Sequence, residues 1–417
     1  MTDAAPELVD IDNSIPEVSQ ERYIHWKKNT KLLYDYLNTN ATKWPSLTCQ
    51  FFPDLDTSTD SHRILLSSFT SSQLPEDEAI YISKISTLDH IKWSSLNNFD
   101  MDEMEFKPDN STKFPSKNLY NDLTVRFPGG DCNRARYLPQ NPDVILAASS
   151  DGSIYVFNRT KHGTTASQSL NSTRYAMKLS SANKSQDIVQ VDETNETVSI
   201  SCNGQKEGLL ASCYSQGQLK VWDISAYSHA DPIINQPVIS LNDADPKGLN
   251  DVSWMPLHDS LIAACGESNY VALHDTRSSE LISQSDSNLH QGGINACKFN
   301  PHNSLLLASG DAEGTVNLWD LRKLDKAPIK SLQHGSAVST LEWSPNLEPI
   351  IATAGQNDGL VKIWDASTDR VIFTHGGHML GVNDIAWNAH DPWLLCSVAN
   401  DNSVHVWRPA RHLVELQ

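Results

Sequence analysis

The sequence predicts an all-β fold, a seven-bladed β-propeller of Trp-Asp (WD) repeats, because similar strand-like segments recur along the chain. Each segment alternates apolar and polar residues and ends in an aromatic residue or histidine followed by a polar residue. The five segments are LKVWDI (219–224), VALHDTR (271–277), VNLWDLR (316–322), VKIWDAS (361–367) and VHVWRPA (404–410). Their polar markers, Asp223, Asp275, Asp320, Asp365 and Arg408, lie 52, 45, 45 and 43 residues apart. A period of about 40–45 residues ending in Trp-Asp is typical of a propeller with four-stranded blades.

Two earlier blades are predicted from strand-like runs that lack the Trp-Asp ending. The runs of the first blade cover 44–52, 63–70 and 79–85, and its marker is Lys84. The second blade covers 132–159 and ends in Phe157-Asn158. Together with the five repeated segments, these runs give seven blades, which form one domain in spite of the length of the chain.

Two features of the propeller are predicted from what the repeats leave over. The last blade needs a strand from outside the C-terminal run, and we expect 44–52 to supply it, which removes the open sheet edges. The polar stretches 86–118 and 161–190 are longer than ordinary blade connections, so we expect them to be surface insertions.

The segments outside the ring are predicted from composition and periodicity. Residues 1–18 are acidic and contain two prolines, so we expect disorder. Residues 19–40 have apolar side chains at helical spacing behind Ser19, a favourable N-cap, and predict an amphipathic helix. The propeller is then expected to span 41–410, and 411–417 to form a short C-terminal helix or tail.

The charge balance favours a basic protein partner. The chain has 417 residues, with 51 acidic and 32 basic side chains and a formal net charge of −19. Such a surface repels nucleic acid, so we expect no direct nucleic-acid binding, and it speeds encounter with basic partners. The seven cysteines lack metal-ligand spacing and predict reduced thiols in the cytosol or nucleus. We find neither a signal peptide nor an apolar run that would span a membrane.

A serine, a histidine and an aspartate in the last blade invite a hydrolase interpretation, but the same residue types recur in the preceding blades. This recurrence favours a structural hydrogen-bond tetrad in each blade, because an enzyme needs one active site and not several. The two clearest tetrads are His378, Ser397, Asp401 and Trp407, and His334, Thr353, Asp358 and Trp364. The preceding blade offers His290, Ser309 and Trp319, with Glu313 at the acidic position. We therefore predict no catalytic residues.

The sequence HGGH at 375–378 invites a metal-site interpretation, since it carries two histidines. We expect no metal, because a third ligand of matching spacing is missing and His378 already belongs to a tetrad. Nucleotide-binding and nucleophile-elbow motifs are also missing from the sequence, so we predict no cofactor.

Several segments outside the common repeat pattern resemble the histone-binding WD-repeat chaperone family, which includes the retinoblastoma-binding proteins. They are HWKKNTKLLYDYLNTNATKWPSLTCQFFP (25–53), NRARYLPQNP (133–142), DVSWMPLHDSL (251–261), THGGHMLGVNDIAWN (374–388) and DPWLLCSVANDNSVHVW (391–407). The resemblance covers about residues 19–415 and is strongest to the fungal small subunit of chromatin assembly factor one. It implies that the N-terminal helix packs on the last blade.

The resemblance implies two binding surfaces. At the edge of the ring, a groove beside the N-terminal helix takes the first helix of histone four. By position, its apolar wall consists of Leu32, Leu33, Tyr36 and Leu37 from the helix, with Phe373 and Leu413. The family usually has an acidic insertion between the sixth Trp-Asp and HGGH, whereas this chain has only 366–374, in which Asp369 is the sole acid.

The second surface is the top face around the central channel, where relatives hold an extended basic peptide such as the histone three tail. The matching positions are Trp44, Asp131, Asn133, Glu196, Asn250 and Asn400. Relatives tend to have acids where this chain has Lys43, Asn250 and Asn400. A weaker attraction for a basic peptide is therefore expected at this face.

These observations lead to a non-enzymatic histone chaperone subunit, nuclear and in part cytoplasmic. It is expected to bind histones three and four together with the larger subunits of chromatin assembly factor one. Other chromatin complexes remain open as partners, above all a type B histone acetyltransferase. A different class, a substrate receptor of a cullin ubiquitin ligase, is kept open by WDLR (319–322) and the partial match HDTR (274–277).

Overall fold

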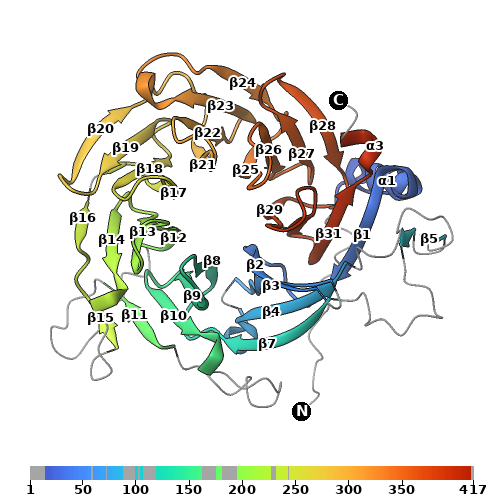
Figure 1. The fold of residues 1–417 in the computed structure, drawn as a ribbon, viewed down its shortest axis with the longest axis horizontal. Coiled ribbons are helices and arrows are strands. Elements are labelled where there is room, and N and C mark those ends of the chain that lie inside the picture. Colours follow the sequence, from blue (N-terminus) through green and yellow to red (C-terminus); the bar gives the residue numbers. More distant parts are fainter. Residues whose placement is uncertain are drawn as a thin grey trace, which may run out of the picture.

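The computed structural model describes residues 15–57, 60–71, 73–87, 99–101, 104–106, 119–161, 175–180, 195–226, 232–242 and 244–414. Seven sheets are arranged radially around a central channel, which confirms the predicted seven-bladed propeller (Figure 1). The five repeat markers lie at or near the ends of the third strands of blades three to seven. Among the described residues we find no helix with the length and hydropathy of a membrane-spanning segment.

Each blade is an antiparallel sheet whose first strand lines the channel. The strands of blades one to three, from the channel outward, are β2 (Cys49–Asp56), β3 (Ser61–Ser67), β4 (Ala79–Ser86) and β7 (Tyr120–Arg126); β8 (Cys132–Leu138), β9 (Asn141–Ser149), β10 (Ile154–Asn158) and β11 (Met177–Leu179); and β12 (Thr197–Cys202), β13 (Leu209–Tyr214), β14 (Leu219–Asp223) and β16 (Ile239–Leu241).

Blades four to seven follow the same plan. Their strands are β17 (Leu249–Trp254), β18 (Leu261–Gly266), β19 (Val271–Asp275) and β20 (Glu280–Gln284); β21 (Ile294–Phe299), β22 (Leu306–Asp311), β23 (Thr315–Asp320) and β24 (Lys330–Gln333); β25 (Val338–Trp343), β26 (Ile350–Gly355), β27 (Val361–Asp365) and β28 (Arg370–His375); and β29 (Val382–Trp387), β30 (Leu395–Ala399), β31 (Ser403–Pro409) and β1 (Tyr34–Ala41).

The apolar core lies between neighbouring blades, because alternate residues of each strand point to opposite faces of its sheet. One cluster, for example, joins Leu273 of blade four to Phe299 and Trp319 of blade five. Blade-ending tryptophans such as Trp222 and Trp407 are fully buried in this way. Burial of apolar surface on both faces thus holds each blade between its neighbours.

The ring is closed by β1, which pairs antiparallel with β31 so that Leu37 lies opposite Trp407. The prediction that 44–52 closes the ring is therefore wrong. The run that begins at Cys49 is instead β2, the innermost strand of blade one. Tyr34 and Tyr36 alternate into the core as a strand requires, and this earlier segment fills the outer position of blade seven.

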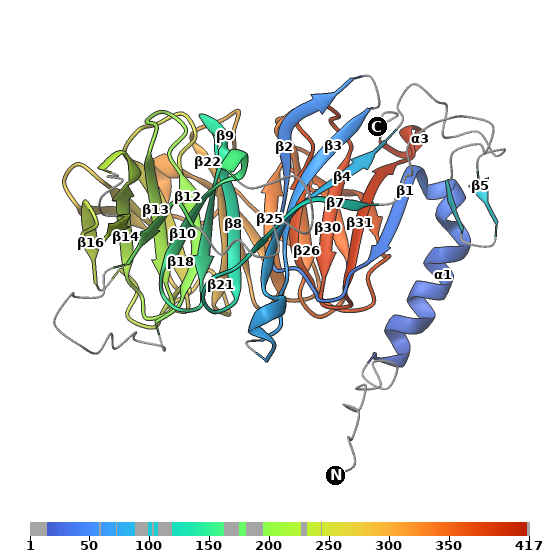
Figure 2. The ribbon, with the colours of Figure 1, turned by 90° about the horizontal axis from the view of Figure 1, so that it is seen from below.

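The N-terminal helix α1 spans Glu17–Leu33 and lies outside the ring beside β1 (Figure 2). The predicted helix over 19–40 is wrong at its end, since the chain turns into a strand at Tyr34. Ser19 is not its N-cap, because the helix begins two residues earlier, behind Pro16, and Ser19 is buried within its first turns. Of the predicted disordered segment 1–18, residues 1–14 lie outside the described residues, and Glu17 and Val18 are helical.

Parts of the two predicted insertions have regular structure. Within 86–118, β5 (Phe99–Asp100) and β6 (Glu105–Phe106) pair as a small hairpin beside α1. Within 161–190, β11 is the fourth strand of blade two, so this stretch is not a simple excursion, and β15 (Ile233–Ile234) adds to its edge in parallel. The remaining residues of both stretches lie largely outside the described ranges. At the C-terminus, Arg411–Val414 form the short helix α3.

A buried carboxylate ties the two ends of the ring together. Asp384 on β29 has no exposed surface and accepts a hydrogen bond from the backbone N–H of Cys49 at 2.9 Å. Its other contact is an ion pair with the Arg136 guanidinium at 3.1 Å. Blades seven, one and two therefore meet at one charged group, whose burial is tolerated because it is paired.

Candidate functional site

The edge of the ring where α1 meets blade seven brings together most of the residues predicted for the histone groove. Trp26 of α1 is buried there, and its ring lies over Gly377. A Cβ atom at residue 377 would lie 2.8 Å from the indole ring, closer than side-chain atoms approach. The glycines of HGGH thus provide the seat for Trp26, which explains this motif without a metal.

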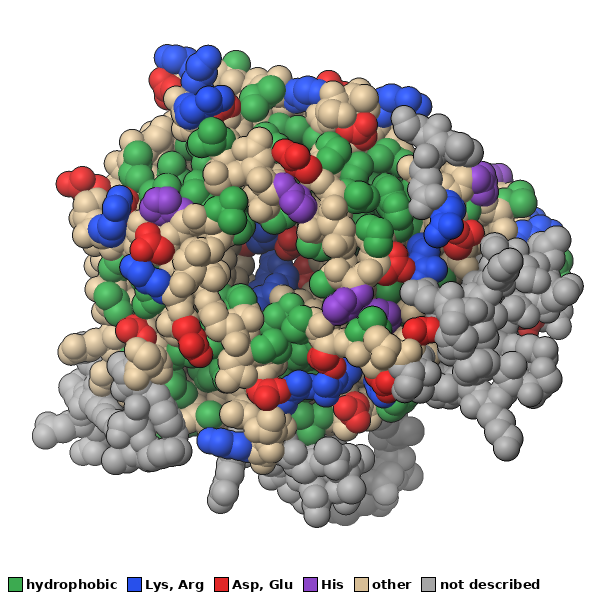
Figure 3. All heavy atoms as spheres, in the orientation of Figure 1, with side chains coloured by type: hydrophobic (Ala, Val, Ile, Leu, Met, Phe, Trp, Pro, Cys, Tyr) green, Lys and Arg blue, Asp and Glu red, His purple; other side chains and the backbone are tan. Residues whose placement is uncertain are grey.

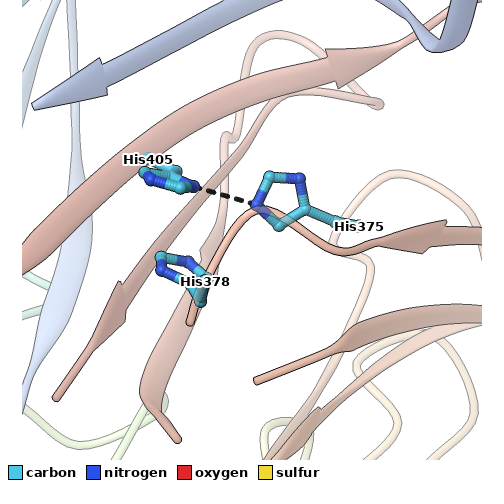
Figure 4. Close-up of side chains that lie close together, drawn as sticks. All are labelled: His375, His378 and His405. Carbon is cyan, nitrogen blue, oxygen red and sulfur yellow. Dashed lines mark hydrogen bonds between the residues drawn. The ribbon is translucent and has the colours of Figure 1, made fainter. Parts of the chain in front are cut away.

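Trp26 begins a chain of buried hydrogen bonds that anchors α1. Its indole N–H donates to the Tyr34 hydroxyl at 2.7 Å. The Tyr34 hydroxyl then donates to Nδ1 of His375 at 2.7 Å, which leaves the proton of this imidazole on Nε2. That N–H donates to Nδ1 of His405 at 3.0 Å (Figure 4). Burial lowers the pKa of His375 and of His405 well below the usual value, so both are neutral at pH 7.

His375, His378 and His405 place ligand nitrogens within 4.8 Å of one another, so the third histidine that the sequence analysis found missing is supplied in space by β31. The geometry nevertheless does not suit a metal ion. The rings of His378 and His405 stack at 14°, with centroids 4.1 Å apart. A metal bound at about 2 Å lies in the plane of each imidazole that ligates it, and two nearly parallel planes offer no common position. The cluster therefore fits hydrogen bonding and packing.

An apolar strip lies at this edge between the end of α1, α3 and β28. Leu32 is 60% exposed, whereas Leu33 and Leu413 are half-buried against the cluster beneath them. Val371 and Ile372 of β28 extend the strip. Phe373 is 5% exposed and packs on Tyr34 and Trp407, so it supports the strip from below.

Tyr36 and Leu37 do not lie on the helix as expected. Both are on β1 and have no exposed surface, because β1 is a core strand of blade seven. They are thus placed in the interior and are not available to a guest. The strip that remains open is smaller than the wall carried over from the resemblance.

The one acid of the shortened linker does not face this strip freely. Asp369 lies in the turn before β28 with a positive φ of 60° and forms an ion pair with Lys330 of blade five at 2.8 Å. Its carboxylate therefore joins blades five and six. The nearest acid to α3 is Asp35, which accepts the backbone N–H of Arg411 at 3.0 Å.

On the top face, Trp44 lies at the rim between blades seven and one. Its indole N–H donates to Asp77 at 3.0 Å, and Lys43 pairs with the same carboxylate. Asp131 is nearly buried below this rim, beside Glu78. Burial and the neighbouring Asp131 raise the pKa of Glu78 to about 7. Asp77 and Glu78 belong to the EDE run at 76–78, which the sequence alone did not place at this rim.

The asparagines predicted at the top face connect neighbouring blades. Asn133 donates to Glu196 and to the carbonyl oxygen of Thr197, both at 3.1 Å. Asn250 does the same with Glu267 at 2.8 Å and with the carbonyl oxygen of the next blade. Asn400 accepts a bond from Asn383, which also reaches blade one. Each carboxylate keeps acceptor sites for a guest, because it has about four lone-pair positions.

The predicted tetrads lie as hydrogen-bonded groups inside their blades. In blade seven, Ser397 contacts Nε2 of His378 at 2.7 Å and accepts the indole N–H of Trp407 at 3.1 Å. Nδ1 of His378 contacts Ser403, which donates to Asp401. Ser397 is fully buried and engaged, so the arrangement gives a substrate no access.

The tetrads of blades five and six match this pattern with one difference. In blade six, Thr353 contacts both His334 and Trp364 at 2.8 Å, while Asp358 lies 3.5 Å from His334. In blade five, the acid that contacts His290 is Asp311, at 2.9 Å. The assignment of Glu313 was wrong, since Glu313 is exposed in the turn that follows Asp311.

Comparisons with known proteins agree with the sequence motifs. A family model named for "Histone-binding protein RBBP4" and for its counterpart in the CAF1 complex matches residues 21–89, which include most of α1, β1 and the first three strands of blade one. A model described as "Nucleolar protein 10-like, N-terminal domain", a β-propeller, matches residues 234–408. Histone-binding protein MSI1 of Saccharomyces cerevisiae (strain ATCC 204508 / S288c) is 63% identical over 420 residues, which cover 99% of each chain. These matches confirm the resemblance stated from the sequence.

Proposed function

Since the chain belongs to the family of Histone-binding protein MSI1, we propose that it is a histone chaperone that binds histones three and four during nucleosome assembly. The observation that carries this proposal is the 63% identity over nearly the whole of both chains. The family model named for histone binding also covers α1, the helix that borders the apolar strip. The protein acts by binding and has no catalytic role in this proposal.

At the edge of the ring, the proposed guest is the first helix of histone four. It packs its apolar face on Leu32, Leu33 and Leu413, in the way that helices bind in apolar grooves. Asp35 and Asp369 border the strip, but each already has a partner. We therefore assign most of the binding energy at this edge to apolar burial, and the net charge of −19 to faster encounter with basic histones.

On the top face, the proposed guest is an extended basic peptide such as the histone three tail. Glu196 and Glu267 lie at the rim with acceptor capacity beyond their bonds to Asn133 and Asn250. Trp44 offers an aromatic edge beside Asp77. These groups suit lysine and arginine side chains, which bind by charge-assisted hydrogen bonds.

The proposed partners in the nucleus are the larger subunits of chromatin assembly factor one. Purification of the native complex followed by mass spectrometry tests this assignment. Recovery of those subunits supports it, whereas recovery of a histone acetyltransferase in their place assigns the chain to a type B enzyme. Recovery of a cullin adaptor alone would contradict both.

The edge surface is tested with Leu32→Asp, because this side chain is exposed and its replacement leaves the core intact. We expect binding of a histone-four helix peptide, measured by fluorescence anisotropy, to weaken by about tenfold or more, since a carboxylate then faces an apolar guest. Val18→Asp is the matched control, for Val18 is 77% exposed on the same helix and about 21 Å away. Equal affinity of Leu32→Asp and the parent protein, with unchanged thermal unfolding, would remove this strip from the account.

A further inference from the structure

The bottom face of the propeller, opposite Trp44, carries an apolar cleft between blades five and six. We call it the five–six cleft. It has a volume of about 350 Å³. Its lining residues are Leu306, Leu318, Ile329, Lys330, Glu348, Pro349, Ala366 and Ser367. It is remote from α1 in sequence and is not part of either surface proposed for histones.

The cleft is apolar and open to solvent. Leu318 and Ala366 are buried and belong to the core between the two blades. Ile329 stands at the wall with 56% of its surface exposed, and the neighbouring Leu305 is 42% exposed. Lys330 is not free, because its ammonium donates to the carbonyl oxygens of Ala366 and Ser367 and pairs with Asp369. The cleft thus offers a preformed apolar recess braced across the two blades.

A basic ridge borders this recess on a protein that is acidic as a whole. Residues 320–330, DLRKLDKAPIK, contain four basic and two acidic side chains. The side chains of Arg322 and Lys326 are 68% and 69% exposed, and each pairs with a neighbouring aspartate. Exposed pairs of this kind are worth little and exchange readily with other anions. Figure 3, which shows the bottom face, displays a cluster of basic side chains on this rim next to hydrophobic ones.

We propose that the five–six cleft is a docking site for an acidic segment of a partner protein. The segment inserts an apolar side chain between Ile329 and Pro349 and lays its carboxylates over Arg322, Lys323 and Lys326. The argument for an acidic occupant is charge complementarity, because screening confines the field at the cleft to charges within about 8 Å. A basic histone segment does not fit this ridge, so the site lets a second partner bind while histones occupy the edge or the top face.

The test is selection of a displayed library of short random peptides on the full-length protein. We expect an enriched group of peptides with acidic residues on either side of Leu, Ile or Phe. A synthetic member of this group, measured by fluorescence anisotropy, should bind at least about tenfold more weakly to Ile329→Asp and to the double variant Lys323→Glu/Lys326→Glu. Its affinity should also fall with added salt, since the ridge contributes by charge.

The matched control is Leu257→Asp, because Leu257 is an equally exposed leucine of blade four, at 57%. It should bind the peptide like the parent protein, and all variants should keep the parent's thermal unfolding and histone-four peptide binding. Enrichment of basic peptides, of no common motif, or of peptides indifferent to Ile329→Asp and to the double variant would overturn the proposal. Failure of histone binding in the parent protein would instead contradict the proposed function and leave the peptide result intact.

Discussion

His274 takes, in blade four, the position that tryptophan has in blades three, five, six and seven. In blade five the tryptophan donates to Ser309 on the neighbouring strand, ten residues earlier. The corresponding residue in blade four is Ala264, so His274 has no hydroxyl to contact. Neither of its ring nitrogens has a hydrogen-bond partner among the described residues. Burial lowers the pKa of His274 to about 4.

We predict that this histidine makes the fold sensitive to acid. In the unfolded chain it binds a proton below a pKa near 6.5, whereas in the folded protein it does so only near pH 4. The unfolded state therefore holds more protons in this interval, and the free energy of unfolding falls as the pH drops from about 6.5 to 4, by up to about 3 kcal/mol for this residue. Urea unfolding across this range should show a shallower pH dependence for His274→Phe than for the parent protein. His375 and His405 keep part of the slope in both, and identical slopes would contradict the prediction.

At the level of single residues, the sequence predicted contacts that repeat within a blade better than contacts across space. The serine, threonine and tryptophan members of the tetrads follow from repeat position alone. The acid of blade five did not, because Asp311 at the end of the strand competes with Glu313 in the turn, and the hydrogen bond to His290 decides. His405 could not be linked to HGGH from spacing, since the pairing of β31 with β1 brings α1 and the three histidines together.

At the level of elements, α1 depends on one aromatic side chain. Trp26 is 5% exposed, and its loss removes both the packing on Gly377 and the first donor of the hydrogen-bond chain. Truncation of a buried tryptophan costs about 3–5 kcal/mol. We expect Trp26→Ala to detach α1 from the ring, seen as faster amide hydrogen exchange over residues 17–33.

Gly377→Ala tests the same contact from the ring, because its methyl group would collide with the indole ring. It should give the same local increase in exchange while strands β12–β27 stay protected. Val18→Ala, an exposed position on α1, is the control and should exchange like the parent protein. Unchanged protection of α1 in both Trp26→Ala and Gly377→Ala would show that other contacts hold the helix.

The end of α1 shows why one element was misassigned. Trp26, Leu33 and Leu37 fit a helical stripe, while Tyr34 and Tyr36 equally fit the alternation of a strand. Short runs of this kind are ambiguous, and tertiary pairing decides between them. Here β31 offers an open edge that only a strand can cover, so the chain leaves the helix at Leu33.

At the level of the whole molecule, the repeat period predicted seven blades because each blade is one local unit of nearly constant length. It could not identify the strand that closes the ring. Both 34–41 and 44–52 precede blade one, and a count of repeats is the same for either. The choice follows from which segment can reach β31 while blade one still receives its innermost strand, and that is a property of the closed ring.

The closed ring also makes Asp384 and Asp251 comparable carboxylates in unequal places. Asp251 has no exposed surface and bonds Ser199, the backbone N–H of Cys297 and the ammonium of Lys298, all within a continuous run of blades. Asp384 makes the corresponding bonds across the seam where the first and last blades meet. Removal of one partner from a buried ion pair costs about 3–5 kcal/mol, so Asp384→Ala and Asp251→Ala should lower the free energy of unfolding by similar amounts in urea.

The two variants should differ in how they open under native conditions. At the seam, β1 and β31 are held to blade one by packing and by Asp384, with a covalent link through the chain on one side alone. We therefore expect Asp384→Ala to raise amide hydrogen exchange in β1, β31 and β2 through a local opening, whereas Asp251→Ala leaves these strands protected up to global unfolding. Equal exchange at the seam in both variants would mean that the ring opens as one unit and that the position of Asp384 gives it no special part in closure.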